Sequence, residues 1–205
     1  MFGATSNPWF DRSILMTSAT EGLGPDLARA LVARGARPVA VGRDGAALAR
    51  LSEDLGGISW IADDALAPER AIPIARWIAD THAGLGGFIC ALPLGPGAAT
   101  SLAPLALLAL AGLSPDAPVG LVLPDAPGTW RVARLAARLR QLRWSVASGS
   151  ALTAIIVPDG FAAAGQELRA MAAGRTLDAL AARRASVRIA APRPAPIARS
   201  ALVAS

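Results

Sequence analysis

The chain has 205 residues, of which 53% are hydrophobic and 17% are charged, and its formal net charge is +5. This length and a mean hydropathy of +0.44 exclude a disordered chain and predict a single domain with one substantial core. The most apolar stretch, residues 94–113, contains Pro96 and Pro104, which argue against a membrane-spanning helix.

Short apolar runs alternate with amphipathic segments along most of the chain. Strands are expected at residues 13–17, 38–42, 58–62, 87–92, 119–123 and 152–157. Helices are expected at 25–34, from Arg43-Asp44 to about Leu55, at 68–82 and at 129–143, with a further apolar segment at 98–113. Apolar strands separated by helices imply a sheet covered on both faces. The predicted fold class is therefore α/β, with a doubly wound parallel sheet in a single domain.

The two ends of the chain are expected to lie outside this domain. Residues 1–12 form a leader, in which Trp9 and Phe10 either anchor a partner or pack back on the core. Ser186 to Ala190 is expected to be a last edge strand, and the prolines beyond it predict a loosely ordered tail over 192–205. The domain is accordingly placed at 13–191.

Several side-chain types are missing or rare. The sequence has no Tyr and no Lys, one His (His82), one Cys (Cys90) and one Asn (Asn7). A single Cys excludes an internal disulfide, and the leader lacks the basic-then-apolar order of a secretory signal, so we predict a cytoplasmic protein. One His and one Cys also argue against a structural zinc site.

The turn after the first predicted strand is rich in glycine. Its residues Thr17-Ser-Ala-Thr-Glu-Gly22-Leu-Gly24 resemble the Thr-Gly-x-x-x-Gly-x-Gly signature of the short-chain dehydrogenase/reductase family, with Ser18 in place of the first Gly. Asp63 falls where an Asp of that family contacts adenine, and Cys90 lies in the segment that matches its strand ending Asn-Asn-Ala-Gly. The resemblance covers about residues 12–160 and implies a Rossmann-like fold.

The same resemblance implies a site for a nicotinamide dinucleotide. Glycines let the backbone approach a pyrophosphate at the start of a helix. Arg43, after the second strand, implies NADP over NAD because a guanidinium neutralises a 2′-phosphate. Ser18 and Pro93 count against binding, since the first adds a side chain to the turn and the second removes a backbone donor. The residues implied in cofactor binding are Thr17, Ser18, Gly22, Leu23, Gly24, Arg43, Asp63 and Cys90.

The catalytic residues of the family have no equivalents. Its hydride transfer uses a Tyr, a Lys, a Ser and an Asn, and the proton must come from a titratable group at the carbonyl. Here Pro127-Gly-Thr-Trp-Arg131 stands where the Tyr-x-x-x-Lys helix would open. The weak catalytic candidates that remain are Asp125, Asp159 and Arg131, and turn capping is the simpler explanation of the two carboxylates.

We therefore predict a non-catalytic protein that acts as an accessory, scaffolding or interaction subunit, with residual NADP binding. The alternative is an atypical NAD(P)-dependent oxidoreductase with other catalytic residues or a partner's residues. A third interpretation is a basic surface for anionic lipid or nucleic acid, although the basic residues lack the interleaved aromatics of nucleic-acid sites. Family members pair through the helices that correspond to 98–113 and 129–143, which implies a homo-oligomer or a protein partner at those segments.

Two single residues have simple structural explanations. Cys90 lies in an apolar strand and is expected to be a small buried hydrophobe rather than a reactive thiol. His82 ends a predicted helix, where a cation would interact favourably with the helix dipole.

Overall fold

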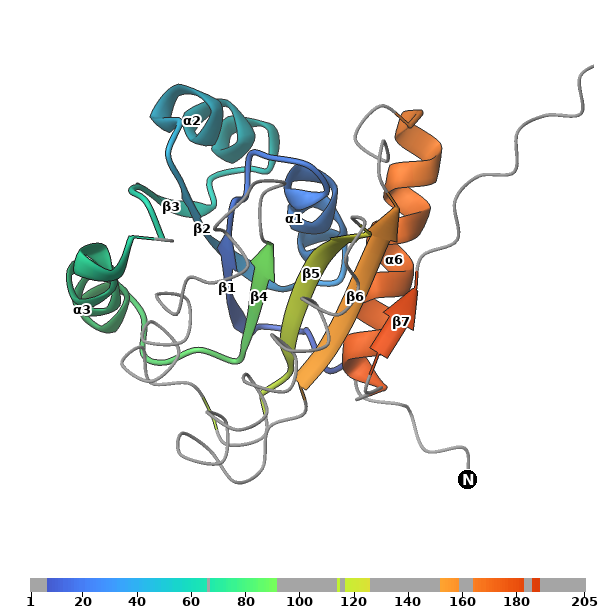
Figure 1. Ribbon diagram of the computed structural model, residues 1–205. Helices are drawn as coiled ribbons and strands as arrows, with labels where there is room; N and C mark the ends of the chain where they lie inside the picture. The colour runs from blue at the N-terminus through green and yellow to red at the C-terminus, as the bar shows by residue number, and fades with distance from the viewer. Residues whose placement is uncertain are drawn as a thin grey trace, which may run out of the picture.

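A single parallel sheet organises the molecule. The computed structural model describes residues 7–65, 67–91, 114, 117–125, 152–158, 164–182 and 186–188. Within these ranges seven strands lie in the order β3-β2-β1-β4-β5-β6-β7, and every pairing is parallel (Figure 1). The strands are β1 (Ser13–Thr17), β2 (Arg37–Gly42), β3 (Ser59–Ala62), β4 (Gly87–Ala91), β5 (Val119–Asp125), β6 (Leu152–Pro158) and β7 (Ser186–Arg188).

The helices cover both faces of this sheet. They are α1 (Gly24–Ala33), α2 (Gly45–Asp54), α3 (Ala71–Thr81), which follows the short 3₁₀ helix η1 (Pro68–Arg70), and α6 (Gln166–Ala181). Ile14 and Met16 of β1 belong to the core shared with α1, α2 and α6, whereas Leu15 belongs to the core shared with α3. Successive strand residues point to opposite faces, so one apolar run supplies both cores. The predicted doubly wound α/β architecture is confirmed.

Most predicted elements are present within a residue or two of their expected bounds. The segment expected as one helix at 68–82 begins as η1 and continues as α3, and the expected edge strand at 186–190 is β7. The expected helix at 129–143, the apolar segment 98–113 and the tail 192–205 lie outside the described residues.

Helix α6 has no counterpart in the sequence predictions. Its buried side chains are mostly small, among them Ala172, Ala173 and Ala179. Alanines produce little contrast between the two sides of a helix, so no apolar stripe of helical period marks this segment. The helix nevertheless packs closely on α1 and supplies Leu177 and Leu180 to the core on that face.

The residues just before β1 are attached to the domain. Trp9 is 2% exposed and belongs to the core, whereas Phe10 is 70% exposed. The Asn7 side-chain amide donates to the carbonyl of Arg34 at 2.7 Å, and the backbone N–H of Asp11 donates to the carbonyl of Gly35 at 2.8 Å. The sequence left open whether Trp9 and Phe10 anchor a partner or pack on the core, and Trp9 packs on the core.

Candidate functional site

The strand order reverses between β1 and β4. Strands β2 and β3 lie on one side of β1, and β4 to β7 lie on the other. In open α/β sheets, the crevice outside the carboxyl ends of the strands at such a switch point is where ligands bind. The turn from Ser18 to Leu23, which joins β1 to α1, lies at this place.

The first part of this turn has an unusual backbone conformation. Ser18 has φ +51°, in the left-handed region, which costs a residue other than glycine about 1–2 kcal/mol. The Ser18 carbonyl accepts from the N–H of Glu21 at 3.1 Å, and the N–H of Ala19 donates to the carbonyl of Val41 at 3.2 Å. These bonds hold a strained residue where the resembled signature has its first glycine.

The two glycines of the turn are needed for different reasons. Gly22 has φ +55°, and a Cβ built on it would meet no atom of the described residues within 4 Å. A Cβ on Gly24 would lie 2.4 Å from the Ser18 carbonyl oxygen, which is closer than real Cβ atoms approach. Gly22 thus leaves room beside the turn, and Gly24 lets α1 start directly against the end of β1.

Helix α1 begins without a side-chain cap. Leu23 occupies the N-cap position, no side chain there accepts a hydrogen bond, and Pro25 stands in the first turn. Uncapped backbone N–H groups and the helix dipole make such an end favourable for an anion. The turn therefore combines the open approach at Gly22 with a helix start suited to phosphate.

An ion pair joins the turn to the end of β2. Arg43 Nη2 lies 3.0 Å from Glu21 Oε1, and both side chains are substantially exposed, at 63% and 42%. The hydrogen bond from Arg43 to Glu21 raises the pKa of the Arg43 guanidinium above its usual value. Arg43 is thus where the sequence placed it, but it is engaged by a carboxylate of the glycine turn itself.

A second ion pair holds the carboxylate that follows β3. Arg70 of η1 donates from Nε to Asp63 Oδ1 at 2.7 Å and from Nη2 to Asp63 Oδ2 at 2.5 Å. This two-point contact from Arg70 lowers the pKa of the Asp63 carboxyl, whose side chain is only 9% exposed. Sequence reasoning did not single out Arg70, which ends η1 seven residues after Asp63.

Thr17 and Cys90 lie side by side at the ends of β1 and β4. The Thr17 hydroxyl is 3.5 Å from Cys90 Sγ and 3.4 Å from the carbonyl oxygen of Ala91, and it donates to these acceptors. Cys90 is 2% exposed, and burial raises its pKa to about 12. The thiol is therefore a buried hydrophobic group, as the sequence predicted, and at neutral pH it is not a thiolate.

The remaining sequence candidates are only partly described. Asp125 is the last residue of β5 and pairs in register with Pro158, which puts its backbone at the same sheet edge as the glycine turn. Arg131, Asp159 and Pro93 lie outside the described residues.

His82 ends helix α3 as expected, but its surroundings disfavour the cation that the sequence interpretation assumed. His82 is the C-cap of α3, and its ring packs edge-on against Trp77 with 6.0 Å between the ring centroids. Burial, together with the nearby Arg37, lowers the pKa of His82, and its buried Nε2 atom has no hydrogen-bond partner among the described residues. Partial removal from water disfavours the imidazolium, so the ring is mainly neutral near pH 7.

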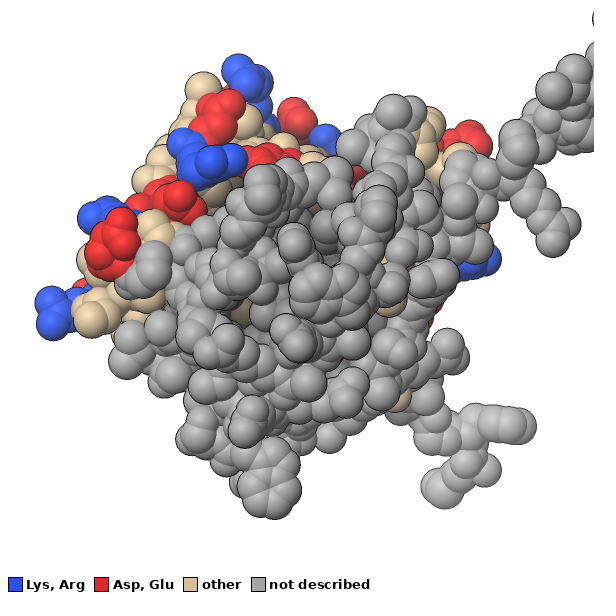
Figure 2. Space-filling view, in the orientation of Figure 1, with Lys and Arg blue, Asp and Glu red and all other residues tan. Residues whose placement is uncertain are grey.

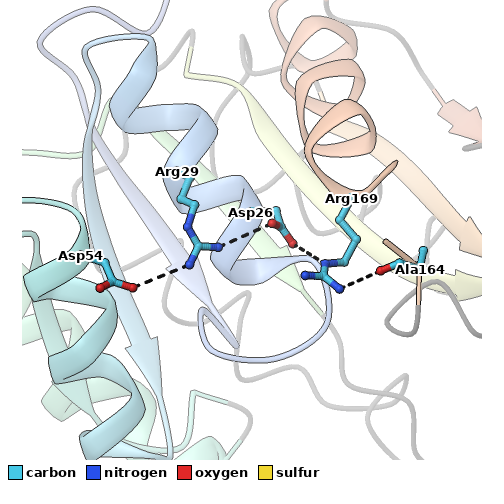
Figure 3. A network of polar contacts seen from close by, with 5 residues as sticks. All are labelled: Asp26, Arg29, Asp54, Ala164 and Arg169. Atoms are coloured by element: carbon cyan, nitrogen blue, oxygen red, sulfur yellow. Dashed lines mark hydrogen bonds and ion pairs between the residues drawn. The ribbon is translucent and has the colours of Figure 1, made fainter. Parts of the chain in front are cut away.

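A charged network that sequence reasoning missed joins α1 to α6 (Figure 3). Asp26, in the first turn of α1, is 5% exposed and accepts from Arg169 Nε at 3.1 Å. Arg169 also donates to the carbonyl of Ala164, and Arg29 lies between Asp26 and Asp54. The network fixes α6 beside the helix that follows the glycine turn. An acidic residue in the first turn of a helix is ordinarily explained by the helix dipole, so no local pattern marks Asp26 as buried.

The rest of the described surface is less specific. A hollow of about 360 Å³ lies at the opposite, amino-terminal edge of the strands, lined in part by Arg12, Arg37 and Ser114. Basic and acidic side chains are interleaved over the side that carries α2 and α3, without gathering by sign (Figure 2). The described residues include no group of three or more His, Cys, Asp or Glu placed to hold a metal ion. None of their helices is long and apolar enough to cross a membrane.

Comparison with known proteins identifies the fold. No protein-family model and no curated protein matches the sequence. Among solved structures, the chain is similar to a citronellol catabolism dehydrogenase of Pseudomonas aeruginosa PAO1, with a TM-score of 0.70, 18% identity, and coverage of 89% of this chain and 95% of that one. A short-chain glucose/ribitol dehydrogenase of Brucella melitensis gives a TM-score of 0.69 and 14% identity, covering 87% and 96% of the two chains. At these identities the likeness shows a Rossmann-like fold of the short-chain dehydrogenase type.

Proposed function

We propose that this chain binds a nicotinamide adenine dinucleotide at the Ser18–Gly24 turn and acts as an accessory or interaction subunit rather than as a short-chain reductase. One observation carries the binding part of the proposal. At the switch point of the sheet, no described residue crowds Gly22 beside an uncapped helix start, which is the arrangement that accommodates a pyrophosphate.

The proposed binding mode assigns roles along the sheet edge. The turn from Ser18 to Gly24 contacts the pyrophosphate, and Asp63 faces the adenine with its carboxylate held in place by Arg70. Arg43 meets the 2′-phosphate of NADP, because it is the exposed cation at the end of β2. Thr17 and Cys90 are 1% and 2% exposed, so they support the sheet edge beside the turn rather than contact the cofactor.

The accessory role is supported by the side-chain inventory. Hydride transfer in short-chain reductases relies on a phenol assisted by an amine, and this sequence contains neither Tyr nor Lys. Cys90 does not replace them, since burial raises its pKa to about 12. The segments 98–113 and 129–143 are proposed to contact a second copy or another protein.

Calorimetric titration with NADPH and with NADH tests the binding proposal. Gly22→Ala should abolish binding, because a methyl group on Gly22 enters the space kept for the pyrophosphate. Gly56→Ala is a matched control: Gly56 also has positive φ, at +78°, and its Cβ would also meet no described atom within 4 Å, but it lies beyond α2. Both variants carry a similar backbone cost, so a difference between them reports the ligand. Wild-type protein that gives no heat at millimolar dinucleotide would refute the binding proposal.

Two further measurements test the accessory role. Light scattering after size-exclusion chromatography is expected to show an oligomer, and a clean monomer that captures no protein from its source lysate contradicts the interaction role. NADPH oxidation over a panel of carbonyl compounds is expected to be absent. Turnover by the purified chain at rates typical of reductases would instead support the alternative of an atypical oxidoreductase.

A further inference from the structure

The contact between Glu21 and Arg43 raises a question that the proposed function leaves open. Arg43 is the cation proposed for a 2′-phosphate, yet its Nη2 donates to Glu21 Oε1 at 3.0 Å. Asp64 adds a second negative charge that interacts with the same guanidinium. A phosphate approaching Arg43 therefore meets a cation whose charge is already partly neutralised.

We propose that Glu21 is a specificity-determining residue that competes with the 2′-phosphate of NADP for Arg43. This inference rests on the proposed binding of a dinucleotide at the glycine turn. Glu21 belongs to that turn, being the residue before Gly22, so its carboxylate is fixed on the same short segment that would contact the pyrophosphate. NADP binds well only when Arg43 releases the Glu21 carboxylate and binds the 2′-phosphate instead. NAD has no 2′-phosphate, so its binding does not require this exchange.

Electrostatics supports a measurable but modest effect. Both partners are exposed, and exposed ion pairs contribute little on their own. The penalty on NADP has a second part, because a carboxylate left beside a phosphate of charge near −2 repels it. Together, these effects correspond to about a three- to tenfold weaker affinity for NADP than the same turn would have without the carboxylate.

The side-chain geometry gives Arg43 a choice of partner. A guanidinium carries five N–H donors in a rigid fork that fits phosphate oxygens at two points, whereas Glu21 is held through one nitrogen. A phosphate can therefore replace the carboxylate by making more contacts with the same group. Glu21 thus sets the affinity for NADP without preventing its binding.

The test compares NADPH and NADH affinities of wild-type protein, Glu21→Gln, Arg43→Gln and the double variant by calorimetry. Glu21→Gln should tighten NADPH binding about three- to tenfold and leave NADH unchanged, because only NADPH carries the competing phosphate. Arg43→Gln should weaken NADPH alone, and the gain from Glu21→Gln should vanish in the double variant. Glu53→Gln, which removes the same charge from an exposed site on α2, is the control and should change neither affinity.

Salt separates an electrostatic role from a merely structural one. At about 1 M salt the screening length falls to about 3 Å, so the advantage of Glu21→Gln for NADPH should shrink strongly. A variant that had only rearranged the turn would shift NADPH and NADH together at every salt concentration.

Each outcome decides between the two proposals. If wild-type protein binds NADPH and Glu21→Gln leaves that affinity unchanged, or tightens both dinucleotides equally, the role of Glu21 is overturned and the proposed function stands. If wild-type protein binds both dinucleotides and Glu21→Gln tightens NADPH alone, the role of Glu21 is supported and the proposed function stands. If neither protein binds either dinucleotide, both proposals are overturned.

Discussion

Replacing Gly24 by Ala is the most direct test of how the glycine turn is built. The added Cβ would lie 2.4 Å from the carbonyl oxygen of Ser18 and 2.8 Å from the carbonyl group of Ala19. Both obstacles are backbone atoms, so no side chain can rotate away, and either the turn or the start of α1 must move. The Ser18 carbonyl also accepts from Glu21, which makes such a shift break further contacts.

The expected magnitude follows from two opposing terms. Overpacking of this kind costs about 1–3 kcal/mol and sometimes more, and a backbone obstacle belongs at the upper end. Ala is a better helix former than Gly by about 0.5–1 kcal/mol, which offsets part of this cost. The net loss in free energy of unfolding is about 2 kcal/mol, which for a chain of this size lowers Tm by about 4–8 °C.

Gly174→Ala provides a matched control for this prediction. Gly174 lies inside α6, and a Cβ there would meet no described atom within 4 Å, so only the gain in helix propensity applies. This variant should be more stable than wild type by about 0.5–1 kcal/mol. Thermal and urea unfolding followed by circular dichroism measure both changes. The reasoning is refuted if Gly24→Ala unfolds within about 0.5 kcal/mol of wild type.

The other predictions concern groups away from the turn. Arg169→Met removes a hydrogen bond from the buried Asp26 carboxylate and should lower the free energy of unfolding, measured in urea, by about 1.5–3 kcal/mol. In a double-mutant cycle with Asp26→Ala, additive effects of the two substitutions would contradict the contact. The lowered pKa of His82 means that the unfolded chain binds its proton first, so stability should fall as the pH drops below about 6.5. His82→Gln should flatten that part of the pH profile, and an unchanged slope would argue against the histidine. Cys90, with a pKa of about 12, should resist a thiol reagent at pH 8 until urea unfolds the protein; rapid labelling of native protein would show that it is accessible.

The local pattern of the sequence determined the fold. Each expected strand among the described residues is a short apolar run, and strands buried on both faces need no alternation to be recognised. The spacing of Gly22 and Gly24 marked the turn between β1 and α1, because glycine is favoured where φ is positive or where backbones touch. These are constraints between residues close in sequence, and a single sequence displays them directly.

Helix α6 and the charged network show what local pattern misses. The buried alanines of α6 give no periodic contrast, and the contact of Asp26 with Arg169 joins residues separated by 143 positions. Similarly, the sequence did not predict the partial burial that lowers the pKa of His82. Burial depends on which distant elements come together, so it is a property of the packed molecule.

The candidate site divides in the same way. The sequence by itself determined which groups lie at the carboxyl edge of the sheet, because its pattern predicted Ser18, Arg43 and Asp63 at the ends of strands. Only the tertiary structure decided their partners: Arg43 is engaged by Glu21, and Asp63 is held by Arg70. A charged side chain acts according to what neutralises it, and the neutralising group is selected by distance in space rather than by position along the chain.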